Sequence, residues 1–372
     1  MNKKEIAEIR KQFTPERCAI TRVCGCYVDA DKNKKLQMKE AFLSLPEEEL
    51  HKYLEIFKKT LSGTLGKNLL QLDFPLEQEQ EGGFQAFMLQ LRQSALEDDD
   101  LLDSFYDRII EHYDYGENYL ILLIHAAYDI PGKASDGLLM DDASDEVYTC
   151  LLCSLCPVNL SKAGLCYNAD SNHIEDRIRD WLVEMPATGF LFPLFQDRST
   201  DIHGMLYYSK NAEQLHTGML EELFGCRAPL SAETQKDSFH MLVENTLGEK
   251  CEYDTVLALH EKIGEIIEAQ KDEPDPVVLT KPEVKRLLEE SGVPETQLED
   301  FDEQYTMAAG SQPALVASNI TNPKKLEIRT PDVVINMDPS RASLVETRVL
   351  DGRKCLIVPI EGEVEINGIH VK

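Results

Sequence analysis

The polar side chains that could perform chemistry gather where the most apolar segments of the chain end. Two short segments carry most of them, Asp129–Lys133 and Asp197–His203. Carboxylates, an imidazole and cations in two such loops could bind a metal ion or an anionic ligand, or could hold the loops together through ion pairs. The candidate ligand-binding residues are therefore His125, Asp129, Lys133, Asp197, Arg198, Asp201 and His203.

Cysteines form the second group that could do chemistry. Cys150, Cys153 and Cys156 are separated by two residues each, a spacing that resembles the iron-sulfur pattern of bacterial ferredoxins. In that pattern the proline follows the fourth cysteine, whereas here Pro157 follows the third and Cys166 lies further on. A buried strand would point alternate cysteines to opposite faces, so we interpret them as structural thiols, with iron-sulfur or zinc ligation as the alternative. Cys18, Cys24 and Cys26 are interpreted as packed thiols too, with a contribution to a zinc site as the alternative.

Compact catalytic signatures are missing from the sequence. It contains no Gly-x-Ser-x-Gly, His-Glu-x-x-His or Gly-x-Gly-x-x-Gly string. A phosphate-binding loop fails at Gly63–Asn68, because Leu61 stands where that motif needs glycine and Asn68 where it needs serine or threonine. His240 and His260 lie in predicted helices, where a histidine is more often packed or at the surface than a ligand. No reaction follows from motifs, and we expect no cofactor.

The balance of charge argues against a nucleic-acid partner. The chain has 38 Lys and Arg against 67 Asp and Glu, a net charge of -29. Residues 1–40 hold ten basic and six acidic residues, a net of +4, which leaves -33 on the remainder. We interpret this basic N-terminal arm as lying against the acidic body of the protein, and we expect no binding to duplex DNA.

The expected location is the cytoplasm. No apolar run behind Met1 resembles a signal peptide, and none approaches the roughly 18 to 20 residues that a membrane span needs. Ten cysteines without a secretion signal should be reduced thiols.

A strand-rich core over residues 119–208 is expected to position the candidate site. Tyr119–Ile124, Leu151–Leu152, Phe190–Phe192 and Met205–Tyr208 are short apolar runs bounded by turn formers, as buried strands are. Both candidate loops follow such runs, so we expect them to meet at one edge of the same sheet. The predicted fold class is α+β, an antiparallel or mixed sheet flanked by helices with a smaller β-rich C-terminal domain.

Two domains are predicted. The main α+β domain covers residues 1–270, with a helical segment over 211–270, and the charged, proline-rich stretch Lys271–Pro276 serves as linker. Residues 277–372 then form a helical hairpin followed by β-rich structure. We do not interpret that hairpin as a DNA-binding helix-turn-helix, because residues 281–303 carry a net charge of -5 and phosphate contacts need the opposite sign.

The chain resembles, nearly end to end, a bacterial family defined by domain of unknown function 4317 and met in anaerobic Gram-positive bacteria. The resemblance implies a bacterial cytoplasmic protein and carries over no catalytic residue. Its segments are Arg10-Lys-Gln-Phe13, Cys24-Gly-Cys26, Ser44-Leu-Pro-Glu47, His125-Ala-Ala-Tyr-Asp-Ile-Pro-Gly132, Cys156-Pro-Val158 and Asp197-Arg-Ser-Thr-Asp-Ile-His203.

Three functional hypotheses follow. The first is a non-enzymatic cytoplasmic protein that binds a protein partner or a small ligand, without nucleic acid or membrane. The second is a metal-dependent hydrolase or nuclease-like enzyme that uses the segments of Asp129 and Asp197–His203. The third is an iron-sulfur or zinc protein that uses Cys150, Cys153, Cys156 and Cys166.

Overall fold

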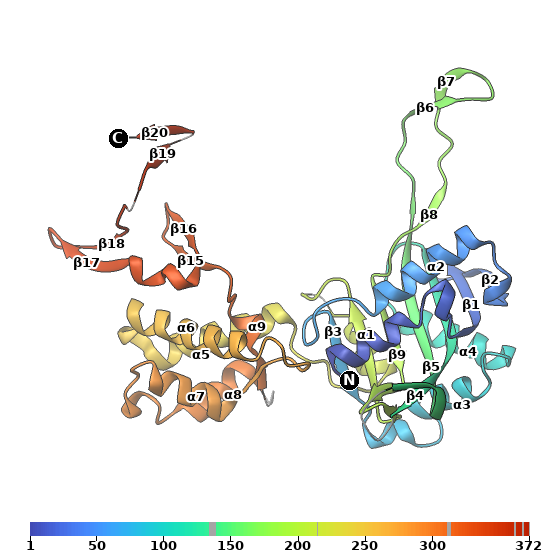
Figure 1. The fold of residues 1–372 in the computed structure, drawn as a ribbon, viewed down its shortest axis with the longest axis horizontal. Coiled ribbons are helices and arrows are strands. Elements are labelled where there is room, and N and C mark those ends of the chain that lie inside the picture. The colour runs from blue at the N-terminus through green and yellow to red at the C-terminus, as the bar shows by residue number, and fades with distance from the viewer. Residues whose placement is uncertain (134–138, 214, 311–313, 361, 367, 372) are drawn as a thin grey trace. The chain divides into compact units, whose positions relative to one another are not determined.

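The computed structural model describes residues 1–133, 139–213, 215–310, 314–360, 362–366 and 368–371. The chain divides into two compact units, Met1–Ser231 and Ala232–Lys372, and each is described by itself (Figure 1). The fold is α+β, as predicted from the sequence.

One antiparallel sheet organises the first unit. Its strands follow the order β2-β1-β4-β5-β9-β12-β3, and β8 pairs with the far end of β5. All four apolar runs expected to be buried strands lie in this sheet. The strand bounds are β1 (Ile20–Val28), β2 (Lys34–Glu40), β3 (Leu69–Asp73), β4 (Tyr119–Lys133), β5 (Leu139–Leu160), β8 (Trp181–Val183), β9 (Thr188–Phe192) and β12 (Gly204–Ser209). Two small hairpins accompany it, formed by β6 (Leu165–Asn168) with β7 (His173–Asp176) and by β10 (Leu194–Gln196) with β11 (Ser199–Asp201).

Helices cover both faces of this sheet. Along β4, Ile121 and Leu123 pack on one face, while Leu122 and Ile124 pack on the other. Because neither face meets water, the central strands carry buried apolar residues on both faces rather than at alternate positions only. One face carries α1 (Lys3–Lys11) and α2 (Glu47–Thr60), and the other carries α3 (Phe84–Gln93), α4 (Asp99–His112) and η4 (Gly218–Leu223). Shorter turns complete the unit: η1 (Pro15–Arg17), η2 (Phe42–Ser44) and η3 (Leu76–Glu79).

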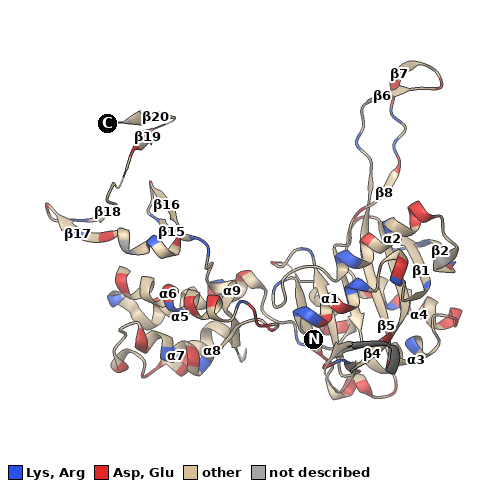
Figure 2. Ribbon diagram, viewed as in Figure 1, with Lys and Arg blue, Asp and Glu red and all other residues tan. Residues whose placement is uncertain are grey.

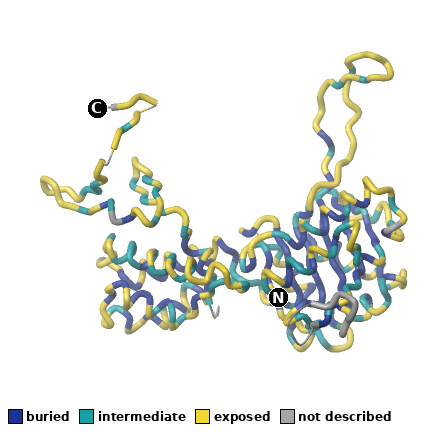
Figure 3. The backbone as a smooth tube through the Cα atoms, viewed as in Figure 1, coloured by how far each residue is buried: buried dark blue, intermediate teal, exposed yellow. Residues whose placement is uncertain are grey.

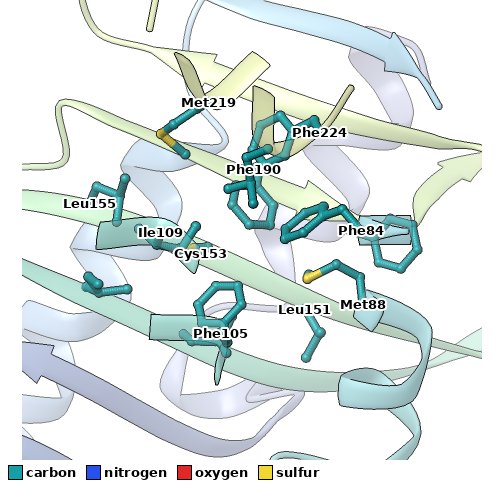
Figure 4. Packing of buried hydrophobic residues seen from close by; sticks show 14 of the residues in the cluster. Phe84, Met88, Phe105, Ile109, Leu151, Cys153, Leu155, Phe190, Met219 and Phe224 are labelled. Carbon is teal, nitrogen blue, oxygen red and sulfur yellow. The ribbon is translucent and has the colours of Figure 1, made fainter. Parts of the chain in front are cut away.

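Aromatic side chains fill the core between α3, α4 and the sheet (Figure 4). Phe190 on β9 lies at the centre, with ring centroids 5.2 Å from Phe224, 6.4 Å from Phe105 and 6.5 Å from Phe84. These rings meet edge to face or nearly so, the arrangement that aromatic quadrupoles favour. The core therefore depends on interdigitated rings from the sheet and from the helices that cover it.

Part of the basic N-terminal arm lies against acidic residues of the protein itself, as interpreted from the sequence. Lys34 Nζ on β2 is 2.6 Å from Asp103 and 2.8 Å from Asp107 of α4. Lys39 Nζ is 2.7 Å from Asp99 in the first turn of that helix. Figure 2 shows acidic residues spread over both units. These lysines therefore neutralise the protein's own carboxylates.

The second unit is a helical body followed by two-stranded hairpins. Buried side chains such as Leu242, Ile263, Leu287 and Phe301 form its core. Its helices are α5 (Ala232–Leu247), η5 (Gly248–Lys250), α6 (Tyr253–Ala269), α7 (Lys281–Glu290), η6 (Glu295–Gln297), α8 (Phe301–Ala309), α9 (Ala317–Ile320) and η7 (Pro339–Leu344). Its hairpins pair β13 (Val278–Thr280) with β14 (Ala314–Val316), β15 (Leu326–Arg329) with β16 (Val334–Met337), β17 (Glu346–Leu350) with β18 (Arg353–Ile357) and β19 (Val364–Ile366) with β20 (Ile369–Val371). None of the helices in the described residues is long and apolar enough to span a bilayer.

The units divide between Ser231 and Ala232, whereas the sequence predicted the division at Lys271–Pro276. Helices α5 and α6 belong with the residues after that stretch: Thr246 Oγ1 donates to Gln304 Oε1 at 2.7 Å, and Val316 N donates to Gln235. Prolines and charges mark a local break in the chain, but they do not report which helices share a core. Whether proteases cut first at Lys271–Pro276 stays a prediction.

Candidate functional site

The predicted loop Asp197–His203 belongs largely to the tight hairpin of β10 and β11. Gln196 pairs with Ser199, so Asp197 and Arg198 form a two-residue turn. Both have positive φ, 50° and 58°, as a type I′ turn requires. The two side chains therefore stand at the tip of a hairpin rather than in an open loop.

The predicted loop Asp129–Lys133 is instead the continuation of β4. Asp129 pairs with Val147 and Ile130 with Glu146 on β5. Polar residues begin at His125, so the sequence pattern predicts an earlier strand end, but the long β4–β5 hairpin pairs these residues as well. Asp129 is exposed, and the side chain of Lys133 lies outside the described part of the structure.

Arg198 brings these two segments together, and it does so with the N-terminal helix. Its Nη2 donates to the carbonyl oxygen of Pro131 at 3.1 Å, and its Nη1 donates to both carboxylate oxygens of Glu8 at 2.8 and 3.0 Å. The hydroxyl of Tyr128 also donates to Glu8, at 2.8 Å, and the Asp197 amide donates to Glu5 at 2.7 Å. We call these five residues, Glu5, Glu8, Tyr128, Asp197 and Arg198, the N-terminal latch.

The remaining candidate residues have separate partners. His125 is buried with its Nδ1 2.7 Å from Thr21 Oγ1, and burial lowers its pKa. His203 is exposed, and a 2.6 Å hydrogen bond to Glu79 raises its pKa. The Asp201 carboxylate accepts from the His203 amide at 3.0 Å. The geometry thus assembles a latch at the β10–β11 hairpin and does not bring the two imidazoles into it.

We expect Arg198→Ala to lower the free energy of unfolding by about 1 to 3 kcal/mol, because Glu8 would keep its half-buried carboxylate without a cation. Urea unfolding followed by circular dichroism measures this change. Combining it with Glu8→Ala should cost less than the sum of the two single changes.

The matched control is Arg22→Ala, which removes a 2.7 Å ion pair with the largely exposed Glu97 and should cost less than about 1 kcal/mol. A ligand-binding role for Arg198 predicts the reverse, an unchanged stability. An unchanged stability of the Arg198→Ala variant would contradict the interpretation that the latch stabilises the fold.

The clustered cysteines point in different directions. On β5, Cys153 packs against the α3 and α4 side of the sheet, while Cys150 and Cys156 pack on the α1 and α2 side. The half-buried Cys166 lies on β6. Burial raises the pKa of Cys150 and Cys156 to about 12, so the ligating thiolate is disfavoured. Among the described residues, no group of three or more His, Cys, Asp or Glu is placed to hold a metal ion.

A groove of about 1030 Å³ lies within the second unit. Helices α5 and α6 form one wall, and the residues after α9, strand β15 and turn η7 form the rest. Apolar side chains contribute part of the lining, among them Val256, Leu257 and Leu326. A volume of this size falls at the upper end of small-molecule sites, which span roughly 300 to 1,000 Å³.

Two imidazoles lie in this groove. His260 Nδ1 is 2.7 Å from Thr321 Oγ1, and its ring meets Phe239 edge on. Burial lowers the pKa of His260 to about 4, with His240 and Lys236 adding to the effect. The pKa of His240 is lowered as well, chiefly by burial. Both rings are therefore neutral at pH 7 and present hydrogen-bonding nitrogens rather than charge.

Carboxylates outnumber cations along the groove. Glu327 binds Lys325 and Arg329, and Glu268 binds Lys271, so these charges are matched. Within the described residues, no ion pair is formed by three further lining residues, Glu252, Glu261 and Glu265. The hydroxyl of Tyr253, also in the lining, is buried without a hydrogen-bond partner among the described residues. The α6 wall of the groove is therefore electronegative and holds an unsatisfied polar group.

Sequence reasoning missed this groove because it interpreted His240 and His260 as packed or surface residues. One signal was available. Each histidine lies ten residues from Lys250, in the connection between two consecutive helices. Residues equally far from such a connection come together when the helices pack antiparallel.

The family model that matches this chain is the domain of unknown function DUF4317, and it spans residues 1–369. A search of curated proteins finds no sequence that matches. The match covers both units, including the latch and the groove. It agrees with the resemblance carried by the six sequence segments above, so the chain belongs to the DUF4317 family.

Proposed function

We propose that this protein is a non-enzymatic cytoplasmic binding protein, and that the groove of its second unit takes an amphipathic organic cation. The observation that carries the proposal is the combination of apolar walls with unmatched carboxylates in a groove of about 1030 Å³. Such a site offers hydrophobic contact to the body of a ligand and charge to one end of it.

Charge decides the class of ligand. The lining holds five glutamates against three basic residues, Lys236, Lys325 and Arg329, and two of these three are already paired with Glu327. The chain as a whole carries -29, which raises the local concentration of cations and lowers that of anions. An anionic ligand would therefore meet repulsion both on approach and in the groove.

Hydrogen bonding favours an amine. The neutral rings of His240 and His260 can accept hydrogen bonds, and so can the unpartnered hydroxyl of Tyr253. Burial raises the pKa of Tyr253, and the negative charges of Asp254 and Glu261 raise it further. A protonated amine bound there would donate to the hydroxyl while facing the carboxylate.

The alternative, a metal-dependent hydrolase at the Asp129 and Asp197–His203 segments, is supported by no comparable set of contacts. Its cationic residue, Arg198, is held by Glu8 and Pro131, and its histidine, His203, is held by Glu79 outside the latch. A catalytic site needs groups that converge on one reacting atom, and these side chains are committed to separate partners.

A pair of probes with the same apolar body and opposite charge tests the proposal. We expect 4-phenylbutylamine to shift the ring signals of His240 and His260 in NMR spectra of the full chain, whereas 4-phenylbutyrate should leave them in place. Glu261→Gln should weaken amine binding about fivefold, the worth of one partly screened charge. Glu233→Gln, on α5 but outside the groove, is the matched control. Equal response to both probes, or to neither, would refute the proposal.

A further inference from the structure

A two-stranded arm extends beyond the sheet of the first unit (Figure 1). Strand β5 pairs with β9 up to Leu155, and past that point Val158–Leu160 pair with β8. The ribbon continues through the Ser161 amide, which donates to Asp180 at 2.8 Å, and ends in the β6–β7 hairpin. We refer to residues 161–187 as the arm, which is distinct from the basic N-terminal arm of residues 1–40.

Most of this arm is exposed (Figure 3), and several of its exposed residues are large and apolar. In the β6–β7 register Tyr167 stands opposite Ile174, and Leu165 shares their face because it lies two residues from Tyr167. Ile178 is 83% exposed, and Trp181, the one tryptophan of the sequence, is 56% exposed. The exposed apolar residues of the arm are Leu165, Tyr167, Ile174, Ile178, Trp181, Leu182, Val183 and Met185.

A ribbon of this kind gains little stability by itself. An isolated two-stranded hairpin is marginal in water, and monomeric proteins seldom expose an apolar patch of more than a few hundred Å². With roughly 100 Å² left uncovered on each of the eight side chains, the arm exposes on the order of 800 Å² of apolar side-chain surface. Within the described residues, β6, β7 and β8 each pair with one strand only, so both edges of the ribbon leave backbone donors and acceptors that another strand could pair.

We propose that this arm pairs with the arm of a second copy of the chain, in a symmetric dimer. If both faces of the two ribbons are covered, two arms together would bury at most roughly 1,600 Å², the size of a standard stable interface. The arm can serve as both halves of a twofold contact, because it supplies an apolar face and two free edges to an identical partner.

Charge favours a second copy over other occupants. The arm holds three basic and five acidic residues, a net of -2, which leaves -27 of the total -29 on the rest of the chain. A basic partner would be steered to the body rather than to the arm. An anionic membrane surface would repel both the arm and the rest of the chain, since each carries net negative charge. Each arm carries only -2 of the chain's -29, so two arms repel each other far less than two whole chains would.

Sedimentation equilibrium of the full chain, over protein concentrations from about 1 to about 100 μM, tests the proposal. We expect a monomer-dimer equilibrium that 0.5 M salt strengthens, since salt screens the repulsion between the bodies. Emission from Trp181 should shift to shorter wavelength as the dimer forms, and it reports on the arm without a label.

Ile178→Asp should weaken dimerisation on the order of 100-fold, because each dimer would lose two apolar contacts and bury two carboxylates. Because Ile178 is exposed, the substitution should leave the fold intact, and circular dichroism of the variant checks this. Leu76→Asp, on η3 and 73% exposed, is the control and should leave dimerisation unchanged. A monomer at all concentrations would overturn the proposal, as would equal weakening by both variants or binding of the monomer to anionic vesicles.

Discussion

Ellman's reagent at pH 8 should modify four of the ten cysteines in the native protein and the other six only after unfolding. The six are buried, and burial raises the pKa of Cys150 and Cys156 from 9.0 to about 12. Because the thiolate is the reacting species, that pKa change alone slows the reaction about 1000-fold. The four reactive thiols are Cys18, Cys166, Cys251 and Cys355, and the six protected ones are Cys24, Cys26, Cys150, Cys153, Cys156 and Cys226.

Two controls test whether burial or a bound metal ion protects the six cysteines. Cys251→Ser removes the exposed thiol and should lower the number of fast-reacting cysteines from four to three. Addition of a chelator should change nothing if burial protects the six. A chelator that exposes Cys150, Cys153 and Cys156 to the reagent would instead identify a metal as the protecting group and establish the cysteine-ligated alternative.

Gly189→Ala should destabilise the first unit by about 3 kcal/mol or more. Gly189 lies on β9, paired with Ser154 of β5. A Cβ at this position would come within 2.3 Å of the Cys153 carbonyl oxygen and 2.7 Å of Thr60 Cγ2. Both neighbours are buried, so the two central strands or the α2 helix would have to move. Urea unfolding followed by circular dichroism measures the loss.

Gly164→Ala is the matched control for this change. No heavy atom lies within 4 Å of a Cβ built at Gly164, which is exposed in the arm. An added methyl group there should change the free energy of unfolding by less than about 0.5 kcal/mol. Equal stability of the two variants would contradict the packing described around Gly189.

Local sequence signals were enough to predict several elements of the fold. The apolar runs that begin at Tyr119 and Phe190 are strands of the sheet, because a run of that length without polar positions fits a strand covered on both faces. The acidic residues at Asp98 open a helix, since the Asp98 carboxylate caps the amides of Asp100 and Leu101. Asp351 and Gly352 form the predicted hairpin turn, and both adopt the positive φ that such a turn requires.

Which polar groups meet could be learned only from the folded chain. The sequence named Arg198 as a site residue, but its partner Glu8 lies 190 positions away and was counted with the basic arm. The sequence also set aside His260, whose pKa follows from burial and from neighbours on another helix. Periodicity and caps are set by residues within a turn or two, whereas ion pairs, grooves and burial depend on chain segments that only folding brings together. Periodicity and caps therefore predicted the strands and the helices, whereas the tertiary fold placed Arg198 in the latch and His260 in the groove.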